Sequence, residues 1–242
     1  MASVIVEGVP PRSRAARSPF YVGVSLLVVV TVLAGFAPSF YLIAVDGNPR
    51  PWIMHLHAAV YLGWLALLVS QAVLAARGKI ATHRRVGTLG IYYAALVWTL
   101  GVIVSFVAPA AHVRAGEWSM EQAVTFLTIP LGDMVLFGSF FGAAIAYRSR
   151  PEIHKRLVLL ACVAIMFAGA FRLSYVLSLP LQFAVWYLPV VAGIAYDLYK
   201  RGRVHPVYWI GVAVMAIALL RIPLGETDLW HSIAGPLLAR FV

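Results

Sequence analysis

The stretch RGKIATHRRV at residues 77–86 recurs as RSRPEIHKRL at residues 148–157, and each copy joins two long apolar segments. Basic residues and a histidine occupy matching positions, so that His83 corresponds to His154. A shorter third copy, RGRVH, lies at residues 201–205. These basic stretches divide the chain into apolar segments and therefore set how many times it can cross a membrane.

The composition between these stretches is that of a membrane protein. Hydrophobic residues make up 62% of the chain and charged residues 12%, whereas a soluble domain is about half apolar and a quarter charged. A helix needs about 20 apolar residues to cross the hydrocarbon core. We therefore predict an all-α, polytopic membrane protein of about seven transmembrane helices, at residues 20–44, 51–76, 84–109, 121–147, 153–178, 180–199 and 206–223.

Two terminal regions flank these segments. We predict that residues 1–19 form a cytoplasmic N-terminal segment and residues 20–242 a single transmembrane domain. The first apolar run is too long for a signal peptide and lacks a small-residue cleavage site, so we expect a retained helix. A tail that contains Trp230 and His231 is expected to form a short amphipathic helix at the membrane surface.

The basic residues lie in alternate loops. With the N-terminus inside, the loops at 77–85, 148–156 and 200–203 are cytoplasmic and hold most of the arginines and lysines. This pattern predicts an N-in, C-out orientation in the bacterial cytoplasmic (inner) membrane. The formal charge of +10 is explained by topology and contact with the lipid bilayer. Basic residues divided among loops argue against a nucleic-acid partner, and a homo-oligomer stays open.

The two long copies indicate an internal repeat. His154 follows His83 by 71 residues, so the helix pair at 51–109 is matched by the pair at 121–178. Parallel repeats of this kind imply a pseudo-two-fold axis along the membrane normal. We predict a central four-helix bundle of helices two to five, whose facing side chains are available for a cofactor.

His83 and His154 each open an outward-running helix at the same membrane depth, which suits two axial ligands of a haem iron. Gly87 lies on the same general face as His83 and would let a flat macrocycle approach the backbone. Cations that could neutralise the haem propionates are Arg84, Arg85 and Arg156. The alternative is that both histidines are interfacial residues beside snorkelling cations.

A second group of polar residues lies on the second apolar segment. His57, Trp64 and Gln71 recur every seven residues and share one helix face. They predict an outer site for haem, quinol or another transition metal, with His57 or His55 as the ligand. His55 and His57 point to opposite sides of a helix, so only one can serve a given metal. The alternative is polar contact between helices.

Asp133 and Arg172 are ionisable residues near the membrane interior, where such residues are costly and usually paired. Arg172 lies five helical turns beyond His154 and therefore on the same face. We expect Asp133 and Arg172 to contribute to the outer polar site, as a bridged pair that is either a structural salt bridge or part of a redox or proton-relay path.

HLH at 55–57, HRRVG at 83–87 and HKRLVLLA at 154–161, followed by Arg172, together resemble an uncharacterised family of small bacterial multipass membrane proteins. More distantly, the chain resembles the ascorbate-type transmembrane cytochromes b, which hold two haems between histidines of alternate helices. This resemblance implies that His83 and His154 ligate one haem. The segment 121–147 has no histidine, so the second haem site is incomplete.

Three functions follow as hypotheses. The leading one is a b-type cytochrome, which passes electrons between a quinol-type donor and a redox partner protein and binds haem b through His83 and His154. The second is a transporter or assembly protein without a redox centre, in which Asp133 and Arg172 gate a small substrate. The third is a metal-dependent membrane oxidase, so that enzymatic activity stays open. The oxidase requires clustered histidines, but His55 and His57 lie roughly a bilayer away from His83 and His154.

Overall fold

The computed structural model describes residues 19–45 and 51–242, and all regular structure in these ranges is helical. Within these ranges, seven stretches of helix are long and apolar enough to cross a membrane, which confirms the predicted all-α multipass class. The crossing elements are α1 (Phe20–Val45), α2 (Trp52–Ala76), α3 (Ile80–Arg114), α4 (Met120–Phe126) with α5 (Thr128–Ala146), α6 (Pro151–Phe171) with the 3-10 helix η1 (Arg172–Tyr175), α7 (Leu179–Arg201), and α8 (Pro206–Ala218) with α9 (Arg221–Gly225).

The third crossing helix is longer than the sequence predicts. The apolar run predicts a helix over residues 84–109, but α3 begins at Ile80 and ends at Arg114. Apolar patterning marks only the part of a helix that faces hydrocarbon, whereas polar residues continue it at both ends. His83, Arg84 and Arg85 therefore lie within the first turns of α3 and not before it.

The fourth crossing segment is interrupted at Leu127, between α4 and α5. Proline has no backbone N–H, so Pro130 cannot donate to the carbonyl of Phe126 four residues earlier, and the helix breaks there. The start of α4 is fixed by a capping box, in which Ser119 and Gln122 each accept the other's backbone N–H. The expected tail helix is α10 (Asp228–Leu238), which packs on α4 and α9.

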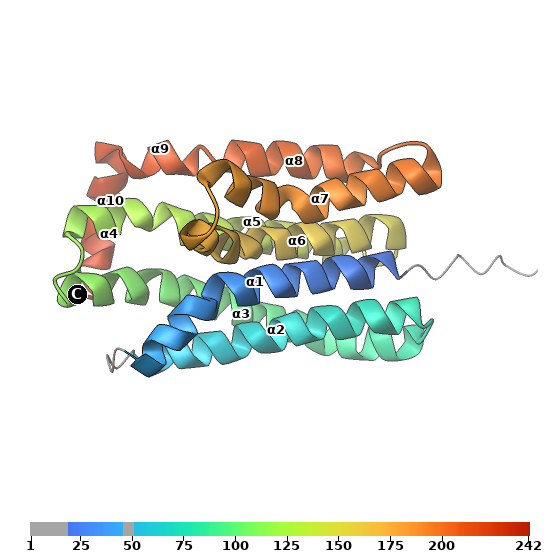
Figure 1. Ribbon diagram of the computed structural model, residues 1–242, viewed down its shortest axis with the longest axis horizontal. Helices are drawn as coiled ribbons and strands as arrows, with labels where there is room; N and C mark the ends of the chain where they lie inside the picture. The colour runs from blue at the N-terminus through green and yellow to red at the C-terminus, as the bar shows by residue number, and fades with distance from the viewer. Residues whose placement is uncertain (1–18, 46–50) are drawn as a thin grey trace, which may run out of the picture.

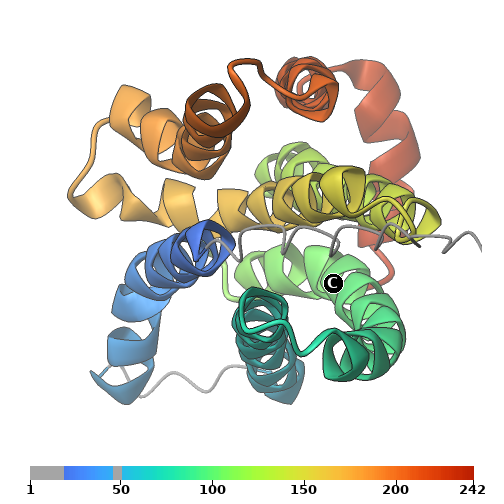
Figure 2. The same ribbon diagram turned by 90° about the vertical axis from the view of Figure 1, so that its right-hand side faces the viewer.

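Helix α6 lies at the centre of the protein. It contacts α1, α5, α7 and α8, and most of its middle residues are buried. Figure 2 shows α6 between α1–α3 on one side and α7–α8 on the other. The hairpins α2–α3 and α5–α6 of the predicted bundle pack through α3 and α5, while α1 and α7 add further layers on α6.

The three basic turns share one end of the molecule, together with the start of α1 (Figure 1). We call this end, with the turns at 77–79, 147–150 and 202–205, the basic end. Helices α4, α9 and α10 and the C-terminus lie at the opposite end (Figure 1). The arrangement agrees with the alternation of basic loops, and the orientation of the basic end toward the cytoplasm stays a prediction.

Helices α1 and α6 approach closely through two glycines. A Cβ atom on Gly35 would lie 1.9 Å from the carbonyl oxygen of Gly169, and a Cβ atom on Gly169 would lie 2.9 Å from Cα of Val32. Small residues allow membrane helices to pack backbone against backbone in this way.

We therefore expect Gly35→Ala to push α1 away from α6 and to lower the free energy of unfolding by about 1–3 kcal/mol, the usual cost of overpacking. Gly23→Ala in the same helix is the control, because no described atom beyond its chain neighbours lies within 4 Å of where its Cβ atom would be. Thermal unfolding in detergent measures both variants. Equal melting temperatures for the two would contradict the close helix contact.

Candidate functional site

His83 and His154 lie at the basic end and form matching hydrogen bonds. Nδ1 of His83 is 3.2 Å from the carbonyl oxygen of Gln71, and Nδ1 of His154 is 2.8 Å from that of Ala144. In both cases the acceptor belongs to the preceding helix of the hairpin. A carbonyl oxygen can only accept, so both Nδ1 atoms carry a proton, and in the neutral form of each ring the Nε2 atom keeps its lone pair. This is the tautomer with which histidine binds a metal through Nε2.

The two histidines occupy corresponding positions near the starts of α3 and α6. Both rings are half-buried, and neither Nε2 atom has a hydrogen-bond partner among the described residues. Two imidazoles on different hairpins are thus each held by the Nδ1 atom, and each has an Nε2 atom without a protein partner in the described ranges. This pair is the part of the candidate site that the sequence predicted most directly.

Gln71 lies beside His83 and presents an unpartnered donor. Its Nε2 atom is buried without a hydrogen bond to any described residue, and its Oε1 atom lies 3.4 Å from where a Gly87 side chain would begin. Arg84 and Arg85, next to His83, are exposed. A haem with its propionates would need imidazole ligands and nearby cations, and His83, His154, Arg84 and Arg85 are residues of these types at the basic end.

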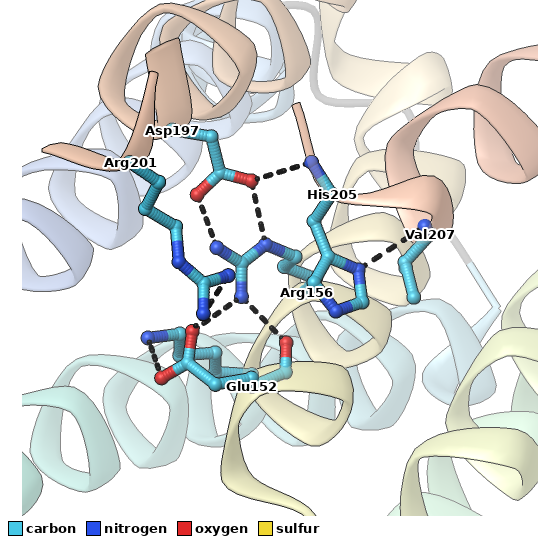
Figure 3. A network of polar contacts seen from close by, with 7 residues as sticks. Glu152, Arg156, Asp197, Arg201, His205 and Val207 are labelled. Carbon is cyan, nitrogen blue, oxygen red and sulfur yellow. Dashed lines mark hydrogen bonds and ion pairs between the residues drawn. The ribbon is translucent and has the colours of Figure 1, made fainter. Parts of the chain in front are cut away.

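Arg156 does not belong to that set, so the expectation that it anchors a propionate is wrong. Its side chain is 1% exposed and all three guanidinium nitrogens are bonded. Nε and Nη2 donate to the two carboxylate oxygens of Asp197, and Nη1 donates to Glu152 (Figure 3). A guanidinium that is fully bonded within the protein cannot neutralise a ligand.

The contacts of Arg156 are part of a larger polar network between α6, α7 and the start of α8 (Figure 3). Asp197 also accepts from the backbone N–H of His205 at 3.1 Å, and Arg201 pairs with Glu152 at 3.2 Å. His205 caps α8, where its Nδ1 atom accepts from the backbone N–H of Val207 at 3.3 Å. The sequence patterns did not predict this network, although Asp197 stands out as an acidic residue in an apolar segment.

The predicted stripe on α2 faces the protein interior. His57 stacks on Tyr61 with ring centroids 4.0 Å apart, and Trp64 meets Phe137 edge-on at 5.4 Å. The Nδ1 atom of His57, Nε1 of Trp64 and Nε2 of Gln71 are all buried without a hydrogen-bond partner in the described part of the chain. His55 is exposed, as expected for the opposite side of the helix.

Asp133 pairs with Arg221 and not with Arg172. Nη2 of Arg221 donates to Oδ1 of Asp133 at 2.6 Å, and both residues are buried. Arg172 instead donates to the carbonyl of Ala168 at 3.0 Å and lies over the ring of Phe36. The expected pair is wrong because α9 packs directly on α5, a contact between distant segments that the sequence does not reveal.

The comparisons of the chain with protein-family models, curated proteins and solved structures give no match. Within the described ranges, no group of three or more histidine, cysteine or acidic side chains could hold a metal ion. The geometry of the site therefore carries the functional argument, and a centre built from clustered histidines has no support among these residues.

The buried ion pair gives a first test. Asp197→Asn would remove the buried carboxylate that accepts from Nε and Nη2 of Arg156 and would leave only the half-exposed Glu152 as its counter-charge. Breaking a buried ion pair typically costs about 3–5 kcal/mol. We expect a large fall in melting temperature in detergent. Glu117→Gln, at an exposed ion pair with His112, is the matched control and should change stability little. A stable Asp197→Asn protein would show that the network does not hold α6 and α7 together.

The cap on α8 gives a pH test. Burial lowers the pKa of His205, and Arg156 and Arg201 lower it further, against a smaller opposing effect of Asp197 and Glu152. The folded chain therefore favours neutral His205, whose Nδ1 lone pair caps α8. This stabilisation is complete above the unfolded-state pKa of about 6.5 and is lost as the pH falls through the folded-state pKa.

We expect the melting temperature to fall on acidification below about pH 6.5. His205→Asn keeps an acceptor at the cap without titrating there, so it should reduce this pH dependence. An identical pH profile for the two proteins would exclude His205 as its source.

Proposed function

We propose that this protein is an integral membrane electron-transfer protein of the b-type cytochrome kind, with His83 and His154 as the axial ligands of one haem b. The observation that carries the proposal is the matched pair of imidazoles. Each ring donates its Nδ1–H to a carbonyl of the preceding helix, and each leaves Nε2 without a partner in the described part of the chain. Carbonyl partners of this kind fix ring orientation and raise the basicity of metal-ligating histidines.

The surrounding side chains would hold the rest of the group. Arg84 and Arg85 are exposed at the same end and would neutralise the propionates, and the buried Nε2 atom of Gln71 would donate to an acceptor beside His83. Haem supplies one-electron chemistry when it is bound. In this proposal the basic end faces the bacterial cytoplasm, and electrons pass between a quinol-type donor and a redox partner.

A transporter or binding protein without a redox centre is the second candidate, because one observation favours it. Asp133 and Arg221 form a buried ion pair inside the helical bundle, and ionisable residues at such depth commonly mark substrate or ion pathways. In that case His83 and His154 would be interfacial residues.

An absorption spectrum distinguishes the two functions. Protein purified from cells supplied with a haem precursor should show a Soret band that shifts on reduction with dithionite. His83→Ala and His154→Ala should each lose most of this band, because each removes one axial ligand. His112→Ala, a half-buried histidine on the same helix as His83, is the control and should keep the spectrum. Colourless, well-folded wild-type protein would refute the cytochrome proposal.

A further inference from the structure

Two buried arginine–aspartate pairs in this protein differ in how completely they are bonded. In the pair at the basic end, every guanidinium nitrogen of Arg156 has a protein acceptor. In the pair toward the opposite end, Arg221 uses only Nη2, which donates to Asp133. The Nε and Nη1 atoms of Arg221 are buried and have no hydrogen-bond partner among the described residues.

This open pair is costly unless another molecule completes it. Arg221 is 8% exposed and Asp133 is 3% exposed. A buried ion pair offsets its desolvation only when further hydrogen bonds satisfy the remaining protons, and each buried donor without a partner is destabilising. The described part of the protein supplies no acceptor for Nε and Nη1 of Arg221. We therefore expect the acceptor oxygens to come from another molecule.

The Arg221 side chain packs against residues of two other helices. Its guanidinium lies over the ring of Phe167, at 4.9 Å from the centroid. Its Cδ, Nη1 and Nε atoms lie beside Gly132, at 2.4, 2.6 and 3.1 Å from where a Cβ atom would be. The side chain of Arg221 from α9 thus packs against a glycine on α5 and an aromatic ring on α6.

The charge balance selects the class of ligand. Asp133 already neutralises Arg221, so an anionic ligand would add a net negative charge inside the membrane, where charge is expensive. A neutral molecule with carbonyl oxygens would accept from Nε or Nη1 without adding charge. The neighbouring α9 residues Ile222 and Leu224 are exposed apolar side chains on a membrane-spanning segment, which suits approach from the lipid.

Other polar groups extend the cluster toward α2. The Tyr61 hydroxyl lies 3.5 Å from Sδ of Met134, the residue after Asp133, and donates to the carbonyl of Val97 at 3.1 Å. His57 stacks on Tyr61 and has its own buried Nδ1 atom without a partner among the described residues. A carboxylate (Asp133), a phenol (Tyr61) and an imidazole (His57) therefore lie in this order from Arg221 to α2. Each of them can exchange a proton with a bound ligand.

We propose that Arg221 is the anchor of a binding site for a neutral, membrane-soluble molecule of the quinone class, with one ring carbonyl accepting from its unpartnered nitrogens. Arg221 and Asp133 bind the oxygen end of the ligand, and Tyr61 and His57 continue the polar path away from it. The redox meaning of this site rests on the electron-transfer function proposed above, whereas binding itself does not require haem.

The test is titration calorimetry of the full chain in lipid nanodiscs with tetramethyl-1,4-benzoquinone, a quinone without free ring positions for thiol addition. Empty nanodiscs correct for partition into lipid, and tetramethylbenzene is the control ring without carbonyl oxygens. We expect saturable binding of the quinone only. Arg221→Lys keeps the charge opposite Asp133 but removes Nε and Nη1, so it should weaken binding roughly 10- to 100-fold.

Arg156→Lys is the matched control, because it makes the same substitution in the closed pair. It should lower the melting temperature and leave quinone affinity unchanged. Arg221→Lys should weaken quinone binding and leave the melting temperature unchanged. If Arg221→Lys proves unstable, the neutral double variant Asp133→Asn/Arg221→Gln replaces it, with the same expected loss of affinity.

Two results would overturn the proposal. Absence of saturable quinone binding to the wild type would show that Arg221 does not bind a quinone, and equal affinity in the wild type and Arg221→Lys would place the ligand elsewhere. Both outcomes are independent of the Soret band. A colourless protein that binds the quinone would refute the cytochrome and keep this site, and a red protein that does not bind it would do the opposite.

Discussion

The pairing of Arg156 with Asp197 fixes the central helix on which the rest of the structure is built. Hydrocarbon offers no partner for a charged or polar group, so each one must be satisfied within the protein. Arg156 meets this constraint through acceptors on α6 and α7, and Asp197 extends the contact to the start of α8. Helix α6 is thereby held against α7 and α8 at the basic end, while Gly169 lets α1 pack closely against it.

This anchoring bears directly on the histidine pair. His154 lies two residues before Arg156 on α6, and two residues turn a helix by roughly 200°, so the two side chains point to opposite sides. One side of the helix start is held by the ion network, and on the other side His154 donates its Nδ1–H to Ala144 of α5. The network is thus structural, yet it sets the orientation on which the proposed haem ligation depends.

The two ends of the bundle handle buried charge differently. At the basic end the arginine is fully bonded, and near the opposite end Arg221 is bonded to a single carboxylate oxygen. Along α2, the buried nitrogens of His57, Trp64 and Gln71 lack partners within the described ranges. The buried polar groups are therefore satisfied more completely at the basic end than near Arg221 and along α2.

The sequence by itself determined the helical class, the seven crossings and the matched histidines, because apolar length and the position of basic residues follow from the local chemistry of the bilayer. It also placed His57, Trp64 and Gln71 on one inward face, since helical periodicity needs only short-range spacing. Only the tertiary structure decided that Asp133 pairs with Arg221, 88 residues away, and that Arg156 pairs with Asp197. Such pairs depend on which helices are neighbours and how each is rotated, and neither property is encoded in any single segment.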